Sequence, residues 1–423
     1  MYCGSCLRDN AMATELLARG HDVLLLPVYT PTFTDEPNVS RDHVVLGGIS
    51  AYLEQYVPFF RKTPRWLDRL WDSTTVLSLA SRKSLSTNPK MLGEMTVSVL
   101  KGEDGFQRKE IHKLIDWLKT EPPPDVINLP YTLLIGLAAP LKEALNRPIL
   151  CTLQGEDLFL DGLQEPYRTE ALDLIRNQVD HVDLFLSVSE YYAAFMPRYL
   201  GIPGNKIRVV PLGINPNGFE LRAPNAAGSF TVGFLARVAP EKGLHVLAEA
   251  YQVLRQSGEL PQGRLEVAGY MAPDCRPYLD EIQKKLKQAG LGDEFHYRGV
   301  VDRAEKIAFL RQLDVMSIPA TYDEPKGVSL LEAMACGVTL VQPRRGGFTE
   351  IVEKTGGGLL VQPDDPRALA DGILEIYRNR ELAAELGAKG SRGVRDHYTS
   401  AHMADKLLQA YESVLPRVEN KVA

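Results

Sequence analysis

The segment Asp323–Gly337 (DEPKGVSLLEAMACG) places two carboxylates on either side of an expected helix start. Glu324 precedes a Pro–Lys–Gly turn, and Glu332 follows eight positions later, within the helix. The backbone N–H groups of Val328 to Leu331 are expected to be free there, which favours an anion. Because carboxylates repel a phosphate, they are better explained as acceptors for neutral hydroxyl groups on its two sides. A molecule with a sugar, a diphosphate and a ribose in a row fits this order. Taken alone, the segment is explained equally well by two solvated glutamates near a helix start.

A second pair of candidate residues lies in the loop after an expected strand. Gly233–Gly243 (GFLARVAPEKG) carries Arg237 and Lys242, five positions apart, before a helix begins. An arginine offers a planar fork for a phosphate, and a lysine offers a point charge. Two such cations are also common on surfaces that bind nothing. Ligands of parallel sheets bind beyond the carboxyl ends of the strands, so we expect the two segments to converge on one crevice.

Apolar runs and helical patterns alternate from Phe230 onward, and this alternation positions the candidate residues. The short runs predict buried strands, and the apolar residues between them recur at helical spacing. One helix is expected to begin at Asp364–Pro366, with Asp as its cap and Pro in its first turn. This pattern predicts βαβ units and a parallel sheet covered on both faces. The predicted strands are Phe230–Ala236, Arg264–Gly269, Phe295–Val301, Val315–Ala320, Val338–Pro343 and Gly358–Val361.

The first half of the chain repeats the pattern with longer insertions. Between the halves, Pro211–Ser229 is rich in Pro, Gly and Asn, which is typical of an exposed connection. The length of 423 residues agrees with two or three domains at about 150 residues each. We therefore expect an α/β protein with doubly wound domains at residues 1–211 and 212–395. The predicted strands of the first half are Asp22–Pro27, Asp125–Leu129, Ile149–Leu153 and Leu184–Val188.

The start of the chain departs from this pattern. A doubly wound domain opens with a central strand that leads into a Gly-bearing loop. Here Gly4 follows only three residues, and Asn10–Arg19 already has the pattern of a helix. The first strand is therefore expected to be missing. Either another segment fills its place or the sequence starts at an internal methionine. We favour the second interpretation, because a hole in a buried parallel sheet leaves two strand edges unpaired.

Taken in order, these residues resemble a known family. The similarity is to the retaining glycosyltransferases of family 4, which have the GT-B fold, and it is most specific in the second half. It implies two doubly wound, Rossmann-like domains facing a central cleft, with residues 396–423 as a C-terminal helix returning toward the first domain. The motifs that carry the resemblance are Arg237–Lys242–Gly243, Glu324–Gly327, Glu332–Gly337, Leu186–Glu190, Val209–Phe219 and Gly356–Asp365.

The resemblance also implies a role for each candidate residue. In that family a nucleotide diphospho-sugar binds mainly to the second domain, and the acceptor, a carbohydrate or a lipid-linked molecule, binds mainly to the first. Arg237 and Lys242 would contact the diphosphate and neutralise charge that grows on the leaving group. Glu324, the third expected catalytic residue, would hold sugar hydroxyls, and Glu332 would hold the ribose. Such enzymes need no metal and no cofactor beyond the donor. The remaining donor-binding candidates of this half are Val300, Gly327, Val328, Ser329 and Leu331.

One position departs from the family pattern. After the expected strand Ile149–Leu153, many members have a histidine that touches the donor sugar, whereas this sequence has Gln154. A glutamine can hydrogen-bond a hydroxyl but carries no charge. Gln154 is therefore a donor-binding candidate, and the identity of the donor stays open, as does any role for Glu156 or Asp157 near the anomeric carbon.

Cys3 and Cys6 form a C-x-x-C motif. This motif could act as a redox pair or supply half of the ligands of a zinc site. No second C-x-x-C or His pair follows in the sequence to complete a zinc site. Gly4 and Ser5 fit better as a glycine-bearing loop that lets the backbone approach a phosphate or the acceptor. Gly4 is therefore a further donor-binding candidate.

Composition and charge exclude several classes of protein. Lys plus Arg is 48 and Asp plus Glu is 54, so the net charge of −6 disfavours a nucleic-acid partner. The longest apolar run, Leu129–Leu141, is interrupted and is shorter than the roughly 20 residues that span a bilayer. Five cysteines make no disulfide framework, and the first residues lack the pattern of a secretory signal, so we expect a cytoplasmic protein.

The stretch Tyr52–Trp71 interleaves aromatic and basic residues. It could make a weak contact with a membrane surface and admit a lipid acceptor, but an insertion packed on the domain explains it better. Pro58 and Pro64 would break any long amphipathic helix there.

The sequence is compatible with three functions. The first is a retaining glycosyltransferase, and the second is a nucleotide-sugar epimerase or a phosphorylase-like enzyme on the same architecture. The third, a non-catalytic sugar-nucleotide-binding protein, is disfavoured because Arg237, Lys242, Glu324 and Glu332 are all present. The fingerprints of dinucleotide-binding and P-loop proteins are absent from the sequence. The nucleotide, the sugar, the acceptor and the oligomeric state stay open.

Overall fold

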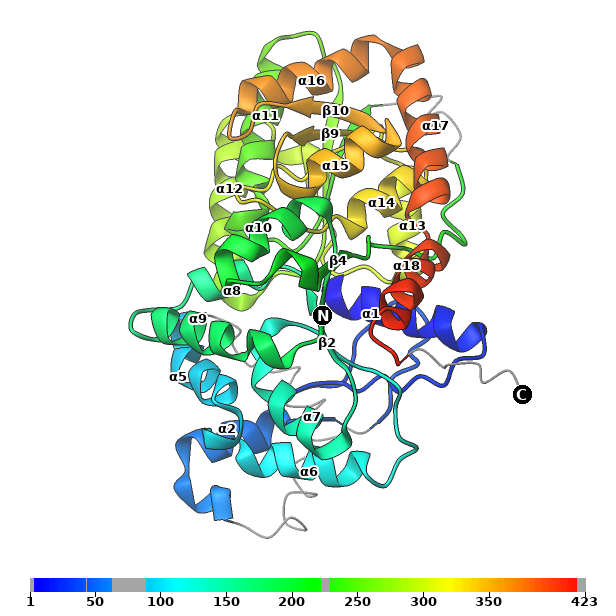
Figure 1. Cartoon of the computed structure of the whole chain (residues 1–423). Coiled ribbons are helices and arrows are strands. Elements are labelled where there is room, and N and C mark those ends of the chain that lie inside the picture. Colours follow the sequence, from blue (N-terminus) through cyan, green and yellow to red (C-terminus); the bar gives the residue numbers. More distant parts are fainter. Residues whose placement is uncertain (1–3, 43, 63–88, 222–228, 417–423) are drawn as a thin grey trace, which may run out of the picture. The chain divides into compact units, whose positions relative to one another are not determined.

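The computed structural model describes residues 4–42, 44–62, 89–221 and 229–416, and the chain divides into two compact units (Figure 1). The N-terminal unit comprises Met12–Pro211 and Ala404–Ala423. The C-terminal unit comprises Met1–Ala11 and Leu212–Met403. One boundary thus falls at the connection after Pro211, and the other two fall inside the first and last helices.

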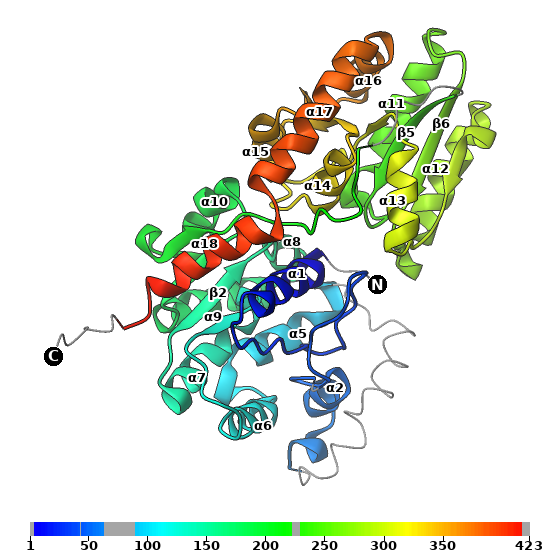
Figure 2. The same ribbon diagram turned by 90° about the vertical axis from the view of Figure 1, so that its right-hand side faces the viewer.

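The C-terminal unit is built on a six-stranded parallel sheet in the order β10-β9-β8-β5-β6-β7. Each strand lies within or next to a segment that the sequence predicts, so these predictions are confirmed. Helix α11 packs against α12 and α16, whereas α17 packs against α14 and α15 (Figures 1 and 2). The strands are β5 (Phe230–Leu235), β6 (Gly263–Ala268), β7 (Phe295–Tyr297), β8 (Val315–Met316), β9 (Thr339–Pro343) and β10 (Gly358–Val361). The helices are α11 (Leu244–Gln256), α12 (Arg276–Gln288), α13 (Arg303–Arg311), α14 (Val328–Ala335), α15 (Gly346–Thr355), α16 (Pro366–Arg378) and α17 (Arg380–His397).

Local sequence explains where these elements begin and end. Every residue of β5 is buried, as expected for a central parallel strand. The side chain of Asp365 accepts hydrogen bonds from the N–H groups of Arg367 and Ala368, so it caps α16 as predicted. Gly243, with φ of +76°, separates a single 3-10 turn (Pro240–Lys242) from α11.

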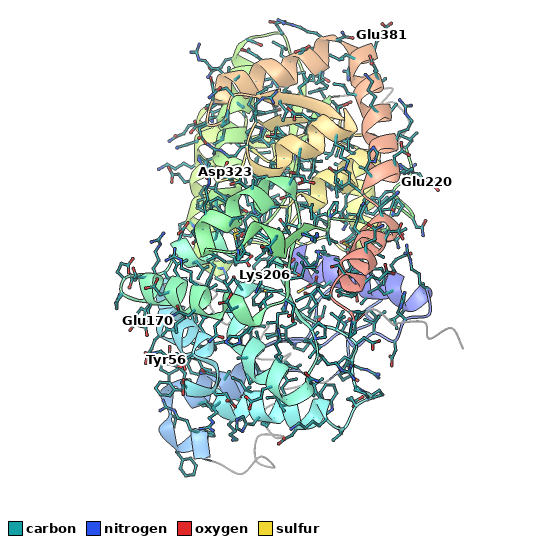
Figure 3. The ribbon with its side chains drawn as sticks, in the orientation of Figure 1. Tyr56, Glu170, Lys206, Glu220, Asp323 and Glu381 are labelled. Carbon is teal, nitrogen blue, oxygen red and sulfur yellow. The ribbon has the colours of Figure 1, made fainter. Side chains whose placement is uncertain are left out.

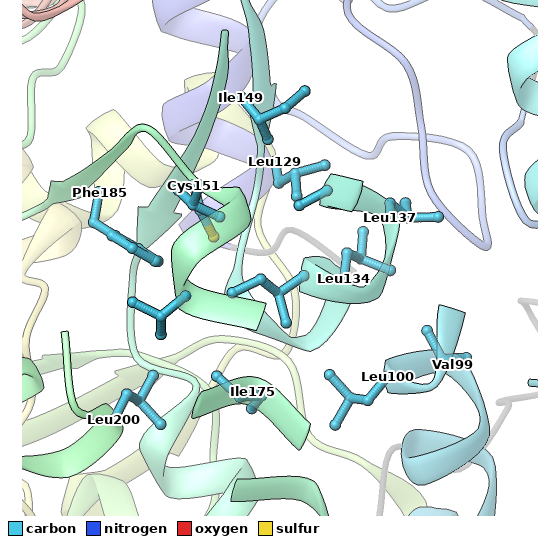
Figure 4. Close-up of a cluster of buried hydrophobic side chains, with 14 of the residues drawn as sticks. Val99, Leu100, Leu129, Leu134, Leu137, Ile149, Cys151, Ile175, Phe185 and Leu200 are labelled. Atoms are coloured by element: carbon cyan, nitrogen blue, oxygen red, sulfur yellow. The ribbon is translucent and has the colours of Figure 1, made fainter. Parts of the chain in front are cut away.

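The N-terminal unit contains a four-stranded parallel sheet in the order β1-β2-β3-β4. Its buried side chains form a core in which residues of β1, β2 and β3 pack against those of α5 and α9 (Figure 4). The strands are β1 (Ile127–Leu129), β2 (Ile149–Leu153), β3 (Leu184–Ser187) and β4 (Ile207–Val209), of which β4 is not among the predictions. The helices are α2 (Gly48–Tyr56), α5 (Pro89–Leu100), α6 (Arg108–Leu118), α7 (Ala138–Leu145), α8 (Asp157–Asp161), α9 (Tyr167–Gln178) and α10 (Glu190–Leu200).

The predicted strand Asp22–Pro27 is wrong. This segment belongs to no sheet, and the carbonyl groups of Leu25 and Pro27 accept hydrogen bonds from the N–H groups of Arg41 and Val45. Arg41 and Val45 belong to an irregular loop and not to a strand. The described pairing near this segment is therefore the isolated bridge between Val28 and Val45. Within the described residues no strand pairs with β1 on the side away from β2.

The expected glycine loop at the start of the chain is also wrong. Gly4 and Ser5 form the first turn of α1 (Gly4–Ala18). The helix therefore begins six residues before the predicted Asn10, because the polar residues of its first turns are compatible with a helix. Cys6 lies in α1, and Cys3 lies outside the described residues.

The last helix, α18 (Ser400–Glu412), has Met403 and Leu407 buried. Its residues from Ala404 onward group with the N-terminal unit, where Asp405 accepts from Arg19 of α1 at 2.5 Å. None of the described helices is long and apolar enough to cross a membrane.

The structure describes the segment Tyr52–Trp71, which was considered for a membrane contact, only as far as Lys62, so residues 63–71 lie outside the described residues. Helix α2 ends at Tyr56, and the 3-10 turn Pro58–Lys62 follows, as Pro58 predicts. Tyr56, labelled in Figure 3, is exposed, and so is Phe59, at 72%. Arg61 donates to the carbonyl groups of Glu54 and Gln55 and lies over the Phe106 ring. The Arg61 guanidinium therefore interacts with groups of its own unit.

Candidate active site

The loops that follow the strands of the C-terminal unit come into close contact at the carboxyl edge of the sheet. A Cβ atom at Gly243 would lie 1.7 Å from the carbonyl oxygen of Pro319, so the loop after β5 touches the loop after β8. A Cβ atom at Gly269 would lie 1.9 Å from the carbonyl oxygen of Ala236, and the N–H of Gly269 donates to Gly299. Both glycines have positive φ, so a side chain there would be strained as well as blocked. This packing collects the predicted segments into one region.

Lys242 and Glu324 are in direct contact. The Nζ atom of Lys242 forms an ion pair with the Glu324 carboxylate and donates a hydrogen bond to the Tyr322 hydroxyl at 2.7 Å. The hydroxyl of Tyr322 donates to the same carboxylate. The structure thus brings together two of the three predicted catalytic residues, and it adds Tyr322, which the sequence analysis missed.

The charge state of Glu324 follows from its neighbours. Burial of the carboxylate opposes ionisation, but the positive charges of Lys242 and Lys326 outweigh it and hold the pKa of Glu324 below its ordinary value. The backbone N–H of Lys326 also donates to Glu324 Oε1, at 3.3 Å. Glu324 is therefore an ionised hydrogen-bond acceptor at neutral pH, which suits the predicted contact with sugar hydroxyls.

Arg237 lies in the same loop as Lys242 but makes a different contact. Its guanidinium pairs with Glu241, one residue before Lys242, and remains partly exposed. Within the described part of the chain, its guanidinium contacts Glu241 and not Glu324. The expected meeting of Arg237 with a donor diphosphate stays a prediction.

The start of α14 offers fewer free N–H groups than predicted. Gly327 is the residue before the helix, and its carbonyl already accepts from the N–H groups of Leu330 and Leu331. The N–H of Leu331 therefore closes the first helical turn and is not free for a ligand. The N–H groups of Val328 and Ser329 keep no partner among the described residues, so they remain available, and their binding of an anion stays a prediction.

The first turns of α1 add polar groups to the C-terminal unit, with which these residues are grouped. Lys326 Nζ donates to the Ser5 hydroxyl at 3.1 Å. Arg8, whose side chain is 1% exposed, donates from Nη1 to Asp9 at 2.6 Å. Its Nε and Nη2 atoms are buried and have no hydrogen-bond partner among the residues that the structure describes. Contact of Gly4 with a donor stays a prediction.

Glu332 is buried in an ion pair with Lys306 of α13, and both side chains are 7% exposed. The sequence analysis missed Lys306, although a lysine on the apolar side of α13 was a usable signal. A carboxylate can accept about four hydrogen bonds, so this pair still allows the predicted contact with a ribose.

The remaining predicted residue of this unit, Val300, lies in the loop between β7 and α13 and is 51% exposed. Beside it, Arg298 pairs with Glu266 of β6 at 2.8 Å, which anchors the loop. An exposed apolar side chain at a sheet edge is compatible with a flat base lying on it, and the contact stays a prediction.

Gln154 lies in the N-terminal unit, directly after β2. It is 3% exposed, and its amide Nε2 donates to the carbonyl of Pro130 at 2.7 Å. Glu156 and Asp157 follow it at the start of α8, and Tyr192 of α10 reaches both carboxylates. Because this cluster and the residues around Glu324 belong to different compact units, each is treated by itself.

No group of three or more His, Cys, Asp or Glu side chains within the described ranges could hold a metal ion.

Comparisons with known proteins match both halves of the chain. Residues 97–217 match the model of Glycosyltransferase Family 4, and residues 220–392 match that of Glycosyl transferases group 1. The chain belongs to the family 4 glycosyltransferases. A phosphatidyl-myo-inositol mannosyltransferase of Mycobacterium leprae is 31% identical over 210 residues, covering 48% of this chain and 53% of the relative. A GDP-mannose-dependent α-(1-6)-phosphatidylinositol monomannoside mannosyltransferase of Mycobacterium tuberculosis is 28% identical over 298 residues, covering 65% of this chain and 74% of the relative.

This family 4 chain spans little more than half the length of some curated relatives, such as the M. leprae protein at 53%. Among solved structures, Anabaena HepE in complex with UDP-glucose has a TM-score of 0.64 and 17% identity, covering 93% of this chain and all of HepE (100%). The likeness shows the fold, which is GT-B with two Rossmann-like α/β domains.

Proposed function

We propose that this family 4 chain transfers a sugar from a nucleotide diphospho-sugar to a hydroxyl group with retention of anomeric configuration and without a metal ion. The observation that carries the proposal is the contact of Lys242 with Glu324 beside the open start of α14. The cation and the two free N–H groups suit a diphosphate. The ionised carboxylate suits the hydroxyl groups of a sugar attached to that diphosphate.

The roles of the residues follow from charge. The bond between the anomeric carbon and the phosphate oxygen breaks, so negative charge grows on the departing diphosphate. Lys242, Arg237 and the N–H groups of Val328 and Ser329 would stabilise that charge, which is the role a metal ion plays elsewhere. Glu324 would fix the sugar hydroxyls.

The first donor to test is GDP-mannose, because the M. tuberculosis relative is named for it. UDP-glucose is the second, because HepE binds it in a structure of the same fold. Phosphatidylinositol is the first acceptor to test, after the name of the M. leprae relative.

The test measures release of nucleoside diphosphate from a panel of GDP-, UDP- and ADP-sugars, with and without acceptor and with excess EDTA. Acceptor-dependent release that EDTA leaves unchanged supports the proposal, and the product's anomeric configuration tests retention. Binding without turnover would favour a sugar-nucleotide-binding protein, and acceptor-independent conversion of the sugar would favour an epimerase.

A further inference from the structure

We propose that Arg345 is a positioning residue for Glu324, and that Asp364 holds the Arg345 side chain in the orientation that this role requires. The inference rests on the proposed sugar transfer and deepens it, because Glu324 would hold the sugar hydroxyls and Arg345 would act only through Glu324. All three residues belong to the C-terminal unit. Arg345 is not among the candidate residues of the sequence analysis.

Arg345 lies between β9 and α15, and its guanidinium joins the loops that follow β8 and β10. Nη1 donates to the Ala320 carbonyl at 3.2 Å, in the loop that leads to Glu324. Nη1 and Nη2 also donate to the two carboxylate oxygens of Asp364, at 3.1 and 2.5 Å. Nε lies 3.6 Å from Oδ1 of Asp323, the residue before Glu324. One side chain therefore connects three loops at the carboxyl edge of the sheet.

The backbone next to Arg345 packs against the backbone of Glu324. The N–H of Gly347 donates to the Glu324 carbonyl at 2.8 Å. A Cβ atom at Gly346 would lie 2.6 Å from the same carbonyl oxygen and 2.8 Å from the Glu324 nitrogen, so a larger residue would prevent this approach. A displacement of Arg345 would therefore also move the main chain of Glu324.

The contacts of Arg345 need a planar fork. Ala320 and Asp364 lie in different loops, and a guanidinium offers donors in one fixed plane to both. A lysine would keep the charge, but its single nitrogen would not reproduce the paired bonds to the Asp364 carboxylate. The Arg345 side chain is 18% exposed and that of Asp364 is 55% exposed, so solvent screens part of the charge attraction. The two parallel hydrogen bonds, more than the charge, therefore fix the orientation of Arg345.

The backbone of Asp364 supplies a second, independent observation. Asp364 has a φ of +56°, in the left-handed region that favours glycine. The cap of α16 is supplied by the next residue, Asp365, so the cap does not require an aspartate at position 364. The carboxylate of Asp364 makes the paired contact with Arg345. The need for a carboxylate at this point explains why a residue other than glycine adopts the left-handed conformation.

The loop that Arg345 holds also touches the loop that carries Lys242. The N–H of Thr321 donates to the Glu241 carbonyl at 3.0 Å, so the segment before Glu324 is held from two sides. Lys242 in turn forms the ion pair with the Glu324 carboxylate. Loss of the Arg345 contacts should let this carboxylate move away from Lys242, although no group that would touch the sugar is lost.

The variant Asp364→Gly tests the role in a protein that is expected to fold. Glycine keeps the left-handed backbone at position 364 without strain, so the urea midpoint should stay close to that of the wild type. The variant removes the carboxylate that orients Arg345, so kcat with the best donor of the panel should fall about tenfold. Affinity for the bare nucleoside diphosphate should not change, because that ligand has no sugar. A lowered urea midpoint with unchanged kcat would show a structural role only and would overturn the proposal.

The neighbouring arginine provides the matched control. Arg344 also forms an ion pair, with Glu353 at 2.6 Å, but both side chains are more than half exposed. Arg344→Ala should therefore leave kcat within about twofold of the wild type. Arg345→Lys should lose as much kcat as Asp364→Gly, because lysine lacks the fork. Wild-type kcat in Arg345→Lys, or an equal loss of kcat in Arg344→Ala, would contradict the proposal.

Combination with Glu324→Gln shows whether Arg345 acts through Glu324. If it does, Asp364→Gly should lower kcat about tenfold when Glu324 is present and hardly at all when Glu324 is already replaced. The same loss in both backgrounds would show that the two residues act independently, and the positioning role would be rejected.

A measurement without turnover separates this inference from the proposed function. Lys242 and Lys326 hold the pKa of Glu324 below its ordinary value, and carbon-13 NMR of labelled glutamate, assigned with Glu324→Gln, measures that pKa. Removal of a negative charge in Asp364→Gly would by itself lower the pKa of Glu324, whereas movement of Glu324 away from Lys242 would raise it. A raised pKa supports the positioning role even if the wild type turns over no donor, in which case the proposed transfer alone fails. An unchanged or lowered pKa overturns the positioning role, whatever the rate of transfer.

Discussion

Lys242 and Glu324 form an ion pair although 82 positions separate them in the chain. The pair joins the end of the loop after β5 to the loop before α14, and Gly243 permits the close approach. It holds a cation and an ionised acceptor side by side, as a diphosphate and its attached sugar would require.

The Glu324 pair predicts a pH dependence of stability. Since Lys242 and Lys326 hold the pKa of Glu324 below its ordinary value of 4.5, the stabilisation is present above that value and is lost as the pH falls through the lowered pKa. Glu324→Gln should reduce the free energy of unfolding at pH 7 by about 1–3 kcal/mol. Urea unfolding at pH 7 and pH 3.5 measures the difference, which should shrink at the lower pH. A difference of equal size at both values would contradict this account.

The buried pair of Lys306 and Glu332 predicts strong coupling. Lys306→Met leaves a buried carboxylate without its partner, which costs about 3–5 kcal/mol. Lys306→Met combined with Glu332→Gln should recover most of the loss, because no unpaired charge remains. A double-mutant cycle by urea unfolding measures the coupling, and purely additive effects would argue against the pair.

Glu332 and Glu324 are expected to affect different parts of the donor. Glu332→Ala should weaken binding of the bare nucleoside diphosphate by about 1–3 kcal/mol, since it removes an acceptor for the ribose. Glu324→Ala should instead lower turnover of the complete donor. Calorimetry with the nucleoside diphosphate compares them, and an equal loss of affinity in both variants would be inconsistent with this division.

Metal removal is expected to have no effect on transfer. The charge on the leaving diphosphate would be balanced by Arg237, Lys242 and the start of α14, so extensive dialysis against EDTA should leave kcat within about twofold. A loss of activity that Mg²⁺ or Mn²⁺ restores would show that a metal ion takes part.

Much of the C-terminal unit could be predicted because its strands are short, apolar and separated by regular helices. The segment Gly358–Val361 is reproduced residue for residue as β10. Asp22–Pro27 also contains an apolar run (VLLL) but forms no strand, since strand formation depends on a neighbouring strand that local composition does not report.

Site residues could be predicted where the residue type and its position in a motif indicate a function, as for Glu324 and Lys242. Partners from distant segments were not predictable. Tyr322 lies two residues before Glu324, but its hydrogen bond from Lys242 spans 80 positions. The place of Lys306 on the apolar side of α13 signals burial, but it does not identify Glu332, 26 positions away, as the partner. The N–H of Leu331 shows the opposite error, because a count of helix-start N–H groups depends on where the first turn closes.

The most direct test of the central claim is the rate of sugar transfer by Arg237→Ala and Lys242→Ala, measured with the best donor and acceptor of the panel. If both cations stabilise the leaving diphosphate, each variant should lose about 100-fold or more in kcat, equivalent to about 2.7 kcal/mol of transition-state stabilisation. Circular dichroism should show that both variants remain folded. Near-normal kcat in both variants would contradict the assignment of the diphosphate to this site.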